Sequence, residues 1–109
     1  MLLAAASSPA YASASQCGHQ IGSATNWVPP PAGIVNNQRD AISIAYIAWA
    51  SINPKMKSVK PDEWQTDMSA RLQDNVWIVT QKDAAKYVNN LIISISRCDG
   101  RVVDVRMTQ

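Results

Sequence analysis

A single helix is predicted by the spacing of apolar residues in the middle of the chain. They recur at intervals of three and four positions, as on one helical face: Ala41, Ile44, Ala45, Ala48, Trp49 and Ile52. Asn36 or Asn37 can cap its start, and Asp40 in the first turn favours the positive end of the helix dipole. Pro54 ends the helix near Asn53, because proline removes a donor and restricts the residue before it. The reverse face is apolar too, so we expect cover on both sides; it holds Ile42, Tyr46, Ile47 and Ala50.

Strands are predicted in the second half of the chain, at Trp64 to Leu72, Val76 to Gln81, Leu91 to Cys98 and Val102 to Met107. The turn signals Gln73-Asp74-Asn75 and Asp99-Gly100 predict antiparallel connections, and Asp-Gly favours a two-residue hairpin turn. One face of each of the last two strands is apolar and the other largely polar: Leu91, Ile93 and Ile95 alternate with Ile92, Ser94 and Ser96, and Val103, Val105 and Met107 alternate with Asp104 and Arg106. We therefore predict an α+β fold in which one main helix packs on the apolar face of a curved antiparallel sheet of about four strands.

The beginning of the chain differs in composition from the rest. Residues 1–12 are predicted to be a signal peptide, and Ala10-Tyr11-Ala12 has the A-x-A form of a cleavage site. No Lys or Arg precedes its short apolar run, which indicates either a truncated signal peptide or a mis-assigned start. Residues 13–33 are rich in Ser, Gly and Pro and predict an extended arm, with Trp27 as its anchor. Residues 34–109 are predicted to form a single domain.

Size and charge exclude several classes of protein. A chain of 109 residues with 47% hydrophobic and 17% charged residues fits one globular domain. The net charge is +2 and the basic residues are scattered singly, so nucleic-acid binding gains no support. No apolar stretch approaches the length of a membrane span, so we expect no membrane anchor.

The two cysteines, Cys17 and Cys98, predict a disulfide bond if the chain is exported to an oxidising compartment such as the periplasm. No C-x-x-C motif is present to poise a reactive thiolate, so the bond is interpreted as structural rather than redox-active. It would join the arm to the end of a late strand.

The order of the motifs resembles that of the NTF2-fold immunity proteins, over roughly Ile34 to Val105. The residues that carry the resemblance are the helix with Asp40, Ala41, Ile42, Ile44, Ala45 and Trp49, then Pro61, then Asn75-Val76-Trp77-Ile78-Val79, then an Ile-rich strand and Asp99-Gly100-Arg101-Val102. The segment Asp83 to Asn90 departs from the Gly-rich loop of that family. The resemblance implies a cystatin-like (NTF2-like) α+β fold and a role in neutralising a toxin delivered by competing bacteria.

Candidate catalytic residues are few. His19 is the only histidine and lies in the predicted arm, so no histidine-based triad or metal cage can be assembled. The carboxylates fall in turns or on predicted solvent-facing positions, and no phosphate-binding glycine motif occurs. Asp40 with Tyr46 is the one arrangement that would mimic the acid of an enzymatic NTF2-like pocket. We expect a protein that is not an enzyme and uses no cofactor.

A protein-binding surface is the remaining expectation. Trp49 and Trp77 are predicted to be core residues, whereas Trp64 is predicted to be exposed. The candidate contact residues are Trp64, Lys55, Lys57, Lys60, Tyr46 and Ile47; the lysines suit an acidic partner, and the last two are covered either by the arm or by a partner. We expect a periplasmic immunity protein that binds a cognate toxin, as monomer or homodimer. The alternatives are an inhibitor of an envelope hydrolase such as a lysozyme, and a small-ligand-binding NTF2-like module.

Overall fold

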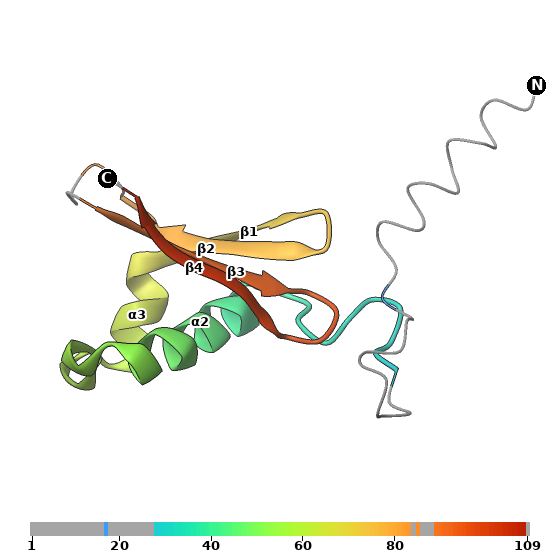
Figure 1. The fold of residues 1–109 in the computed structure, drawn as a ribbon, viewed down its shortest axis with the longest axis horizontal. Coiled ribbons are helices and arrows are strands. Elements are labelled where there is room, and N and C mark those ends of the chain that lie inside the picture. The colour runs from blue at the N-terminus through green and yellow to red at the C-terminus, as the bar shows by residue number, and fades with distance from the viewer. Residues whose placement is uncertain (1–16, 18–27, 84, 86–88, 109) are drawn as a thin grey trace, which may run out of the picture.

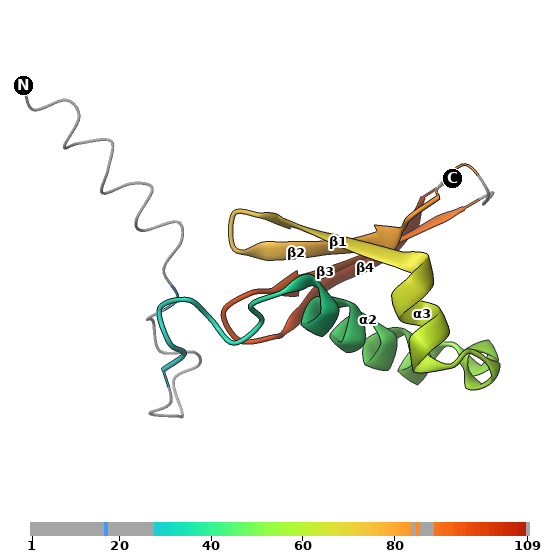
Figure 2. The ribbon, with the colours of Figure 1, turned by 180° about the vertical axis from the view of Figure 1, so that it is seen from behind.

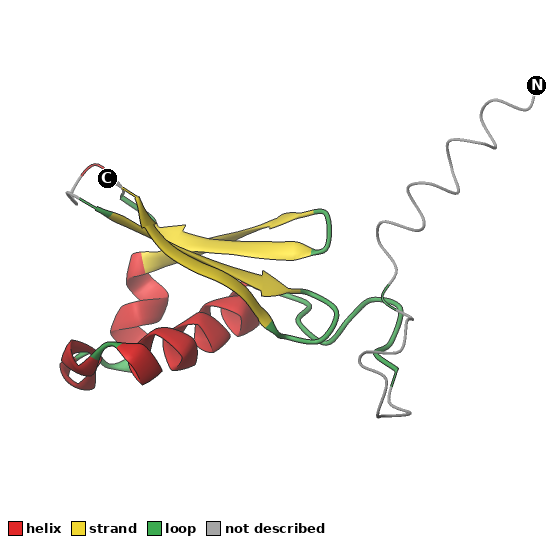
Figure 3. Cartoon of the chain, viewed as in Figure 1, coloured by secondary structure: helices red, strands yellow, loops and turns green. Residues whose placement is uncertain are grey.

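Helices form one layer of the structure and a four-stranded sheet forms the other (Figures 1 and 3). The computed structural model describes Cys17 and residues 28–83, 85 and 89–108. Along the chain the elements are α2 (Gln38–Ile52), the 3-10 helix η1 (Pro54–Ser58), α3 (Pro61–Asp67), β1 (Met68–Gln73), β2 (Val76–Gln81), β3 (Asn90–Ser96) and β4 (Val102–Thr108). The predicted α+β class, with one main helix on a four-stranded antiparallel sheet, is confirmed.

The main helix, α2, has the ends that the sequence predicts. Asn37 is the N-cap, and its side-chain Oδ1 accepts a hydrogen bond from the Asp40 amide at 2.9 Å. Asn53 is the C-cap, immediately before Pro54. The helix buries Ala41, Ile42 and Ala45, whose mostly small side chains allow close approach to the sheet. Figure 2 shows α2 running along one face of the sheet with α3 beside it.

The strand predicted from Trp64 is wrong in its first half. Pro61–Asp67 forms α3, and β1 begins only at Met68. Proline occupies the first helical turn, where its missing N–H costs nothing, and Asp62 and Glu63 lie in that turn near the positive end of the helix dipole. The Lys60 amide donates to Glu63 Oε1 at 3.0 Å. Local capping chemistry therefore outweighs the strand pattern.

The sheet is an antiparallel meander in the order β1-β2-β3-β4. Asp74, with φ of 57°, and Asn75 form the predicted tight turn between β1 and β2, in which Gln73 pairs with Val76. The β3–β4 connection is longer than the predicted two-residue turn, because β3 ends at Ser96 and β4 begins at Val102. The predicted alternation of β3 is confirmed, since its side chains facing the helices are buried: Leu91, Ile93 and Ile95.

The predicted apolar face of β4 is largely left in solvent. Val103 is 53% exposed and Met107 is 49% exposed, although Val105 packs against the core. A register shift lies between Ser94 and Ile95, so that Ile95 pairs with Val102 and not with Val103. In addition, α2 packs mainly on β1, β2 and β3, which leaves the outermost strand at the margin of the helix layer.

The end of the arm is fastened to the β3–β4 connection. The predicted disulfide is confirmed: Cys17 and Cys98 are bonded across 81 positions of sequence, and the Cys17 amide donates to the Pro31 carbonyl at 2.9 Å. Arg97 Nη1 donates to the Ala32 carbonyl at 2.9 Å. The bond is consistent with an oxidising location outside the cytoplasm. Trp27, the predicted anchor, and the signal peptide lie outside the described residues.

No helix in the described part of the chain is long and apolar enough to cross a bilayer.

Replacing both Cys17 and Cys98 by Ser is expected to lower the free energy of unfolding by roughly 2–5 kcal/mol, because an 81-residue separation is no longer closed in the unfolded chain. Urea unfolding followed by tryptophan fluorescence measures the loss, with the oxidised wild type as reference. A loss below about 1 kcal/mol would contradict the role given to the bond.

Two glycines with the same backbone conformation allow the contact at the end of the arm to be tested separately from backbone strain. Gly33 (φ 80°) and Gly100 (φ 77°) both have left-handed backbones, so Ala at either position costs about 1–2 kcal/mol. A Cβ on Gly33 would also collide with the Arg97 carbonyl, whereas at Gly100 the nearest atoms are 3.6 Å away. Gly33→Ala is therefore expected to destabilise by about 1–3 kcal/mol more than Gly100→Ala in the same unfolding assay. Equal losses of stability would show that the Arg97 carbonyl can move away from the added Cβ at no measurable cost.

Candidate protein-binding site

Trp64 is buried, and the prediction that it is exposed is wrong. Its side chain is 6% exposed, and its indole Nε1 donates to the Ile42 carbonyl at 2.8 Å. The indole therefore attaches α3 to α2. It turns toward α2 because Trp64 belongs to a helix and not to a strand.

Tyr46 lies beside Trp64 and covers it from α2. The two rings meet edge to face, with centroids 5.8 Å apart and an interplanar angle of 65°. The Tyr46 hydroxyl donates to the Val59 carbonyl at 2.6 Å, which attaches the segment before α3 to α2 as well. Of the described residues, Trp64 and not the end of the arm covers this part of the helix.

Ile47 follows Tyr46 and is 68% exposed, the largest fraction among the large apolar side chains of the described chain. It lines a cleft of about 300 Å³ between α2 and α3, here called the α2–α3 cleft. The other lining residues are Arg39, Ser43, Tyr46, Pro61, Asp62, Trp64 and Gln65. Three of the six predicted contact residues, Tyr46, Ile47 and Trp64, therefore meet in one place.

A second set of side-chain contacts fixes the width of the cleft. Gln65 Nε2 donates to the Arg39 carbonyl at 3.0 Å and to Ser43 Oγ at 2.9 Å. These bonds join α3 to the first half of α2, while the Trp64 indole joins it to Ile42. These hydrogen bonds therefore set how α3 lies against α2 along the cleft.

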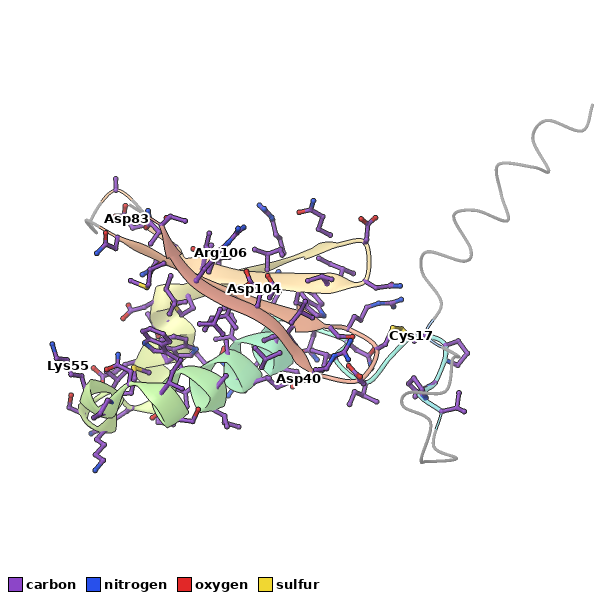
Figure 4. All side chains as sticks on the ribbon, viewed as in Figure 1. Cys17, Asp40, Lys55, Asp83, Asp104 and Arg106 are labelled. Atoms are coloured by element: carbon purple, nitrogen blue, oxygen red, sulfur yellow. A yellow bond between two sulfur atoms is a disulfide. The ribbon has the colours of Figure 1, made fainter. Side chains whose placement is uncertain are left out.

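The three lysines lie outside the cleft. Lys55 and Lys57 are on η1, Lys60 is the N-cap of α3, and all are exposed. Figure 4 shows Lys55 at the end of the molecule opposite Cys17. Lys60 immediately precedes Pro61, which lines the cleft, so positive charge lies next to its α3 side. The structure therefore brings together the aromatic and apolar candidates but not the lysines.

A further cavity of about 220 Å³ lies between the helices and the sheet. Its lining is mostly apolar, as expected, and consists of Trp49, Met56, Val59, Trp64, Asp67, Met68, Gln81, Leu91 and Met107. Gln81 Oε1 already accepts from the Leu91 amide at 2.9 Å, and Asp67 is exposed. Asp40 is exposed at the start of α2 and lines neither this cavity nor the cleft, and the Tyr46 hydroxyl donates to the Val59 carbonyl, so the structure does not pair Asp40 with Tyr46 as an acid in a pocket.

No group of three or more His, Cys, Asp or Glu side chains lies together as a metal site in the described ranges. His19 lies outside them. The α2–α3 cleft is lined by the buried Trp64, the half-buried Tyr46, the exposed Ile47, and an exposed cation and anion, Arg39 and Asp62.

Sequence reasoning missed α3, and with it the cleft. The signal was present, since Pro61 followed by Asp62 and Glu63 is a helix start: proline in the first turn with carboxylates beside it. Arg39, Ser43 and Gln65 were not predicted as site residues, because their meeting depends on where α3 docks.

Trp64→Phe tests the junction between the helices. The ring against Tyr46 remains, but the hydrogen bond to the Ile42 carbonyl is lost, so we expect a loss of stability about 1 kcal/mol larger than for Trp49→Phe. Trp49 is a matched control because it is partly buried against the same core and makes no indole hydrogen bond within the described structure. Equal losses by thermal or urea unfolding would show that the indole N–H contributes nothing.

Comparisons of the chain with protein-family models, with curated proteins and with solved structures give no match.

Proposed function

We propose that this protein is a non-enzymatic immunity protein that binds and neutralises a bacterial toxin acting in the cell envelope. The order of motifs that resembles the NTF2-fold immunity proteins supports this, as does the α+β arrangement of one main helix on a four-stranded sheet. The Cys17–Cys98 disulfide fits a place of action outside the cytoplasm.

The observation that carries the proposal is Ile47 at the α2–α3 cleft. Ile47 is 68% exposed in the middle of a helix and lines a cleft with Tyr46 and Trp64, so a partner's protruding apolar side chain would gain contact area there at little ordering cost. Arg39 and Asp62 at the rim provide charges of both signs that fix the partner's orientation. Inhibition is steric, because the partner's active surface is covered and no bond is made or broken.

The lysines act on association rather than on the contact itself. Lys55, Lys57 and Lys60 are exposed on one short stretch of the chain outside the cleft, and Lys60 immediately precedes Pro61 of its lining. Such a cluster attracts an acidic partner and raises the association rate more than the affinity, in a manner that salt screens.

The test uses the full chain with its disulfide formed, incubated with the secreted effectors of the source cells and of competing bacteria. We expect it to capture a toxin and to abolish that toxin's activity. Ile47→Asp is expected to weaken this binding at least about tenfold without changing thermal stability, since it places a charge at the apolar centre of the contact.

Ile52→Asp is the matched control. Ile52 is 62% exposed on the same helix but does not line the cleft, so this variant is expected to bind like the wild type. If Ile47→Asp and wild type bind the toxin equally, the cleft is not the contact. Capture and inhibition of an envelope hydrolase such as a lysozyme would instead make the protein a hydrolase inhibitor. Thermal stabilisation by a small apolar molecule without any captured protein would favour ligand binding in the cavity under α2.

A further inference from the structure

Strand β4 is an open edge of the sheet. It pairs with β3 on one side, and no other strand of the described chain pairs with it. Val103 and Met107 are exposed, and β4 contains neither Pro nor Lys, two residues that commonly protect an edge from pairing. Figure 4 shows Asp104 and Arg106 side by side along this strand. The edge is thus available for another strand.

The sequence of β4 is complementary to itself about its central residue, Val105. If two copies of β4 pair antiparallel with Val105 opposite Val105, Asp104 of each copy faces Arg106 of the other. The exposed apolar residues face each other in the same register, Val103 opposite Met107. Opposite charges and apolar pairs directly across two strands both stabilise a sheet.

In the isolated chain, Asp104 and Arg106 already contact each other on the same strand. Arg106 Nε lies 3.5 Å from Asp104 Oδ2 on the same strand, with side chains 65% and 49% exposed. An exposed pair of this kind contributes little to the stability of the single chain. Both groups are therefore free to exchange this contact for the partner copy's opposite charge at small cost.

The other edge of the sheet lacks this property. The only charged residue of β1 is Arg71, and antiparallel pairing of two β1 strands about it would place Arg opposite Arg. No carboxylate in β1 compensates for the repulsion. Self-pairing is thus favoured at one edge and opposed at the other.

We propose that two copies of this chain associate through β4, antiparallel and centred on Val105, so that one continuous sheet runs across both copies. The contact is isologous and closes on itself as a twofold dimer. The register shift opposite Val103 makes residues 104–106 the best-defined part of the pairing. A single pair of strands buries less than the roughly 1,200 Å² of stable interfaces, so we expect a dissociation constant on the order of micromolar.

The proposed dimer leaves the α2–α3 cleft accessible. Helix α3 packs on α2 and on β1, at the opposite edge of the sheet from β4. The dimer therefore presents two clefts and does not depend on the function proposed for them.

Sedimentation velocity of the full, disulfide-bonded chain, from low micromolar to several hundred micromolar, is the test. The wild type is expected to shift from the mass of one chain to that of two. Arg106→Asp places carboxylates opposite carboxylates, and Asp104→Arg places guanidiniums opposite guanidiniums, so each variant alone is expected to dimerise at least about tenfold more weakly. Arg71→Asp on the other edge is the matched control and is expected to dimerise like the wild type.

Mixing the two single variants gives the decisive measurement. The carboxylates of one copy then face the guanidiniums of the other, so a mixed dimer is expected to form although neither variant dimerises well alone. Damage to the fold cannot produce this recovery, and circular dichroism of each variant checks the fold directly. A wild type that stays a single chain throughout, a mixture that does not recover, or a mass that grows beyond two chains would each overturn the proposal, the last by showing pairing between unlike edges.

Discussion

The packing of α2 on three of the four strands is the constraint from which the other surfaces follow. Ala41 and Ala45 are fully buried and small, so the helix approaches the sheet closely, and the Ile42 carbonyl accepts the hydrogen bond from Trp64 of α3. Because α3 takes the β1 side, a cleft forms between the two helices there. The same placement leaves Val103 and Met107 of the edge strand β4 exposed. The position of the helix layer thus accounts for the cleft and for the apolar residues left in solvent at the opposite edge of the sheet.

Two indole groups join this helix layer to its surroundings by the same kind of bond. Trp64 Nε1 donates to the Ile42 carbonyl and Trp77 Nε1 to the Val35 carbonyl, each at 2.8 Å and each buried. The first fixes α3 against α2, and the second fixes the segment before α2 against the sheet. A buried donor that finds a partner far away in sequence stabilises one arrangement over its alternatives, since any other arrangement leaves it unpaired.

The part predicted best from sequence is β3, because burial alternates regularly along it and its core-facing positions are buried. The spacing of apolar residues predicted that α2 is a helix but only part of its buried face. Ile42, predicted on the reverse face, is buried, whereas Ile52, predicted on the core face, is 62% exposed. The segment Pro61–Asp67 is too short to show a helical period, so its capping residues were the better guide. Alternation in β4 indicated a strand correctly, but it did not show that the strand lies beyond the reach of α2. Trp64 and the cleft depended on tertiary packing, which local pattern does not contain. The disulfide was predictable because only two cysteines exist.

The covalent link between Cys17 and Cys98 also determines what a protease can achieve. All the described helices and the first three strands lie between the bonded cysteines. A single cut anywhere in that span, in the connection between β2 and β3 for instance, adds a water molecule to the mass but releases no fragment. The two pieces stay covalently joined in one molecule, and they separate only when the bond is reduced. As long as the disulfide is oxidised, a chain cut once in this span therefore stays a single covalent molecule.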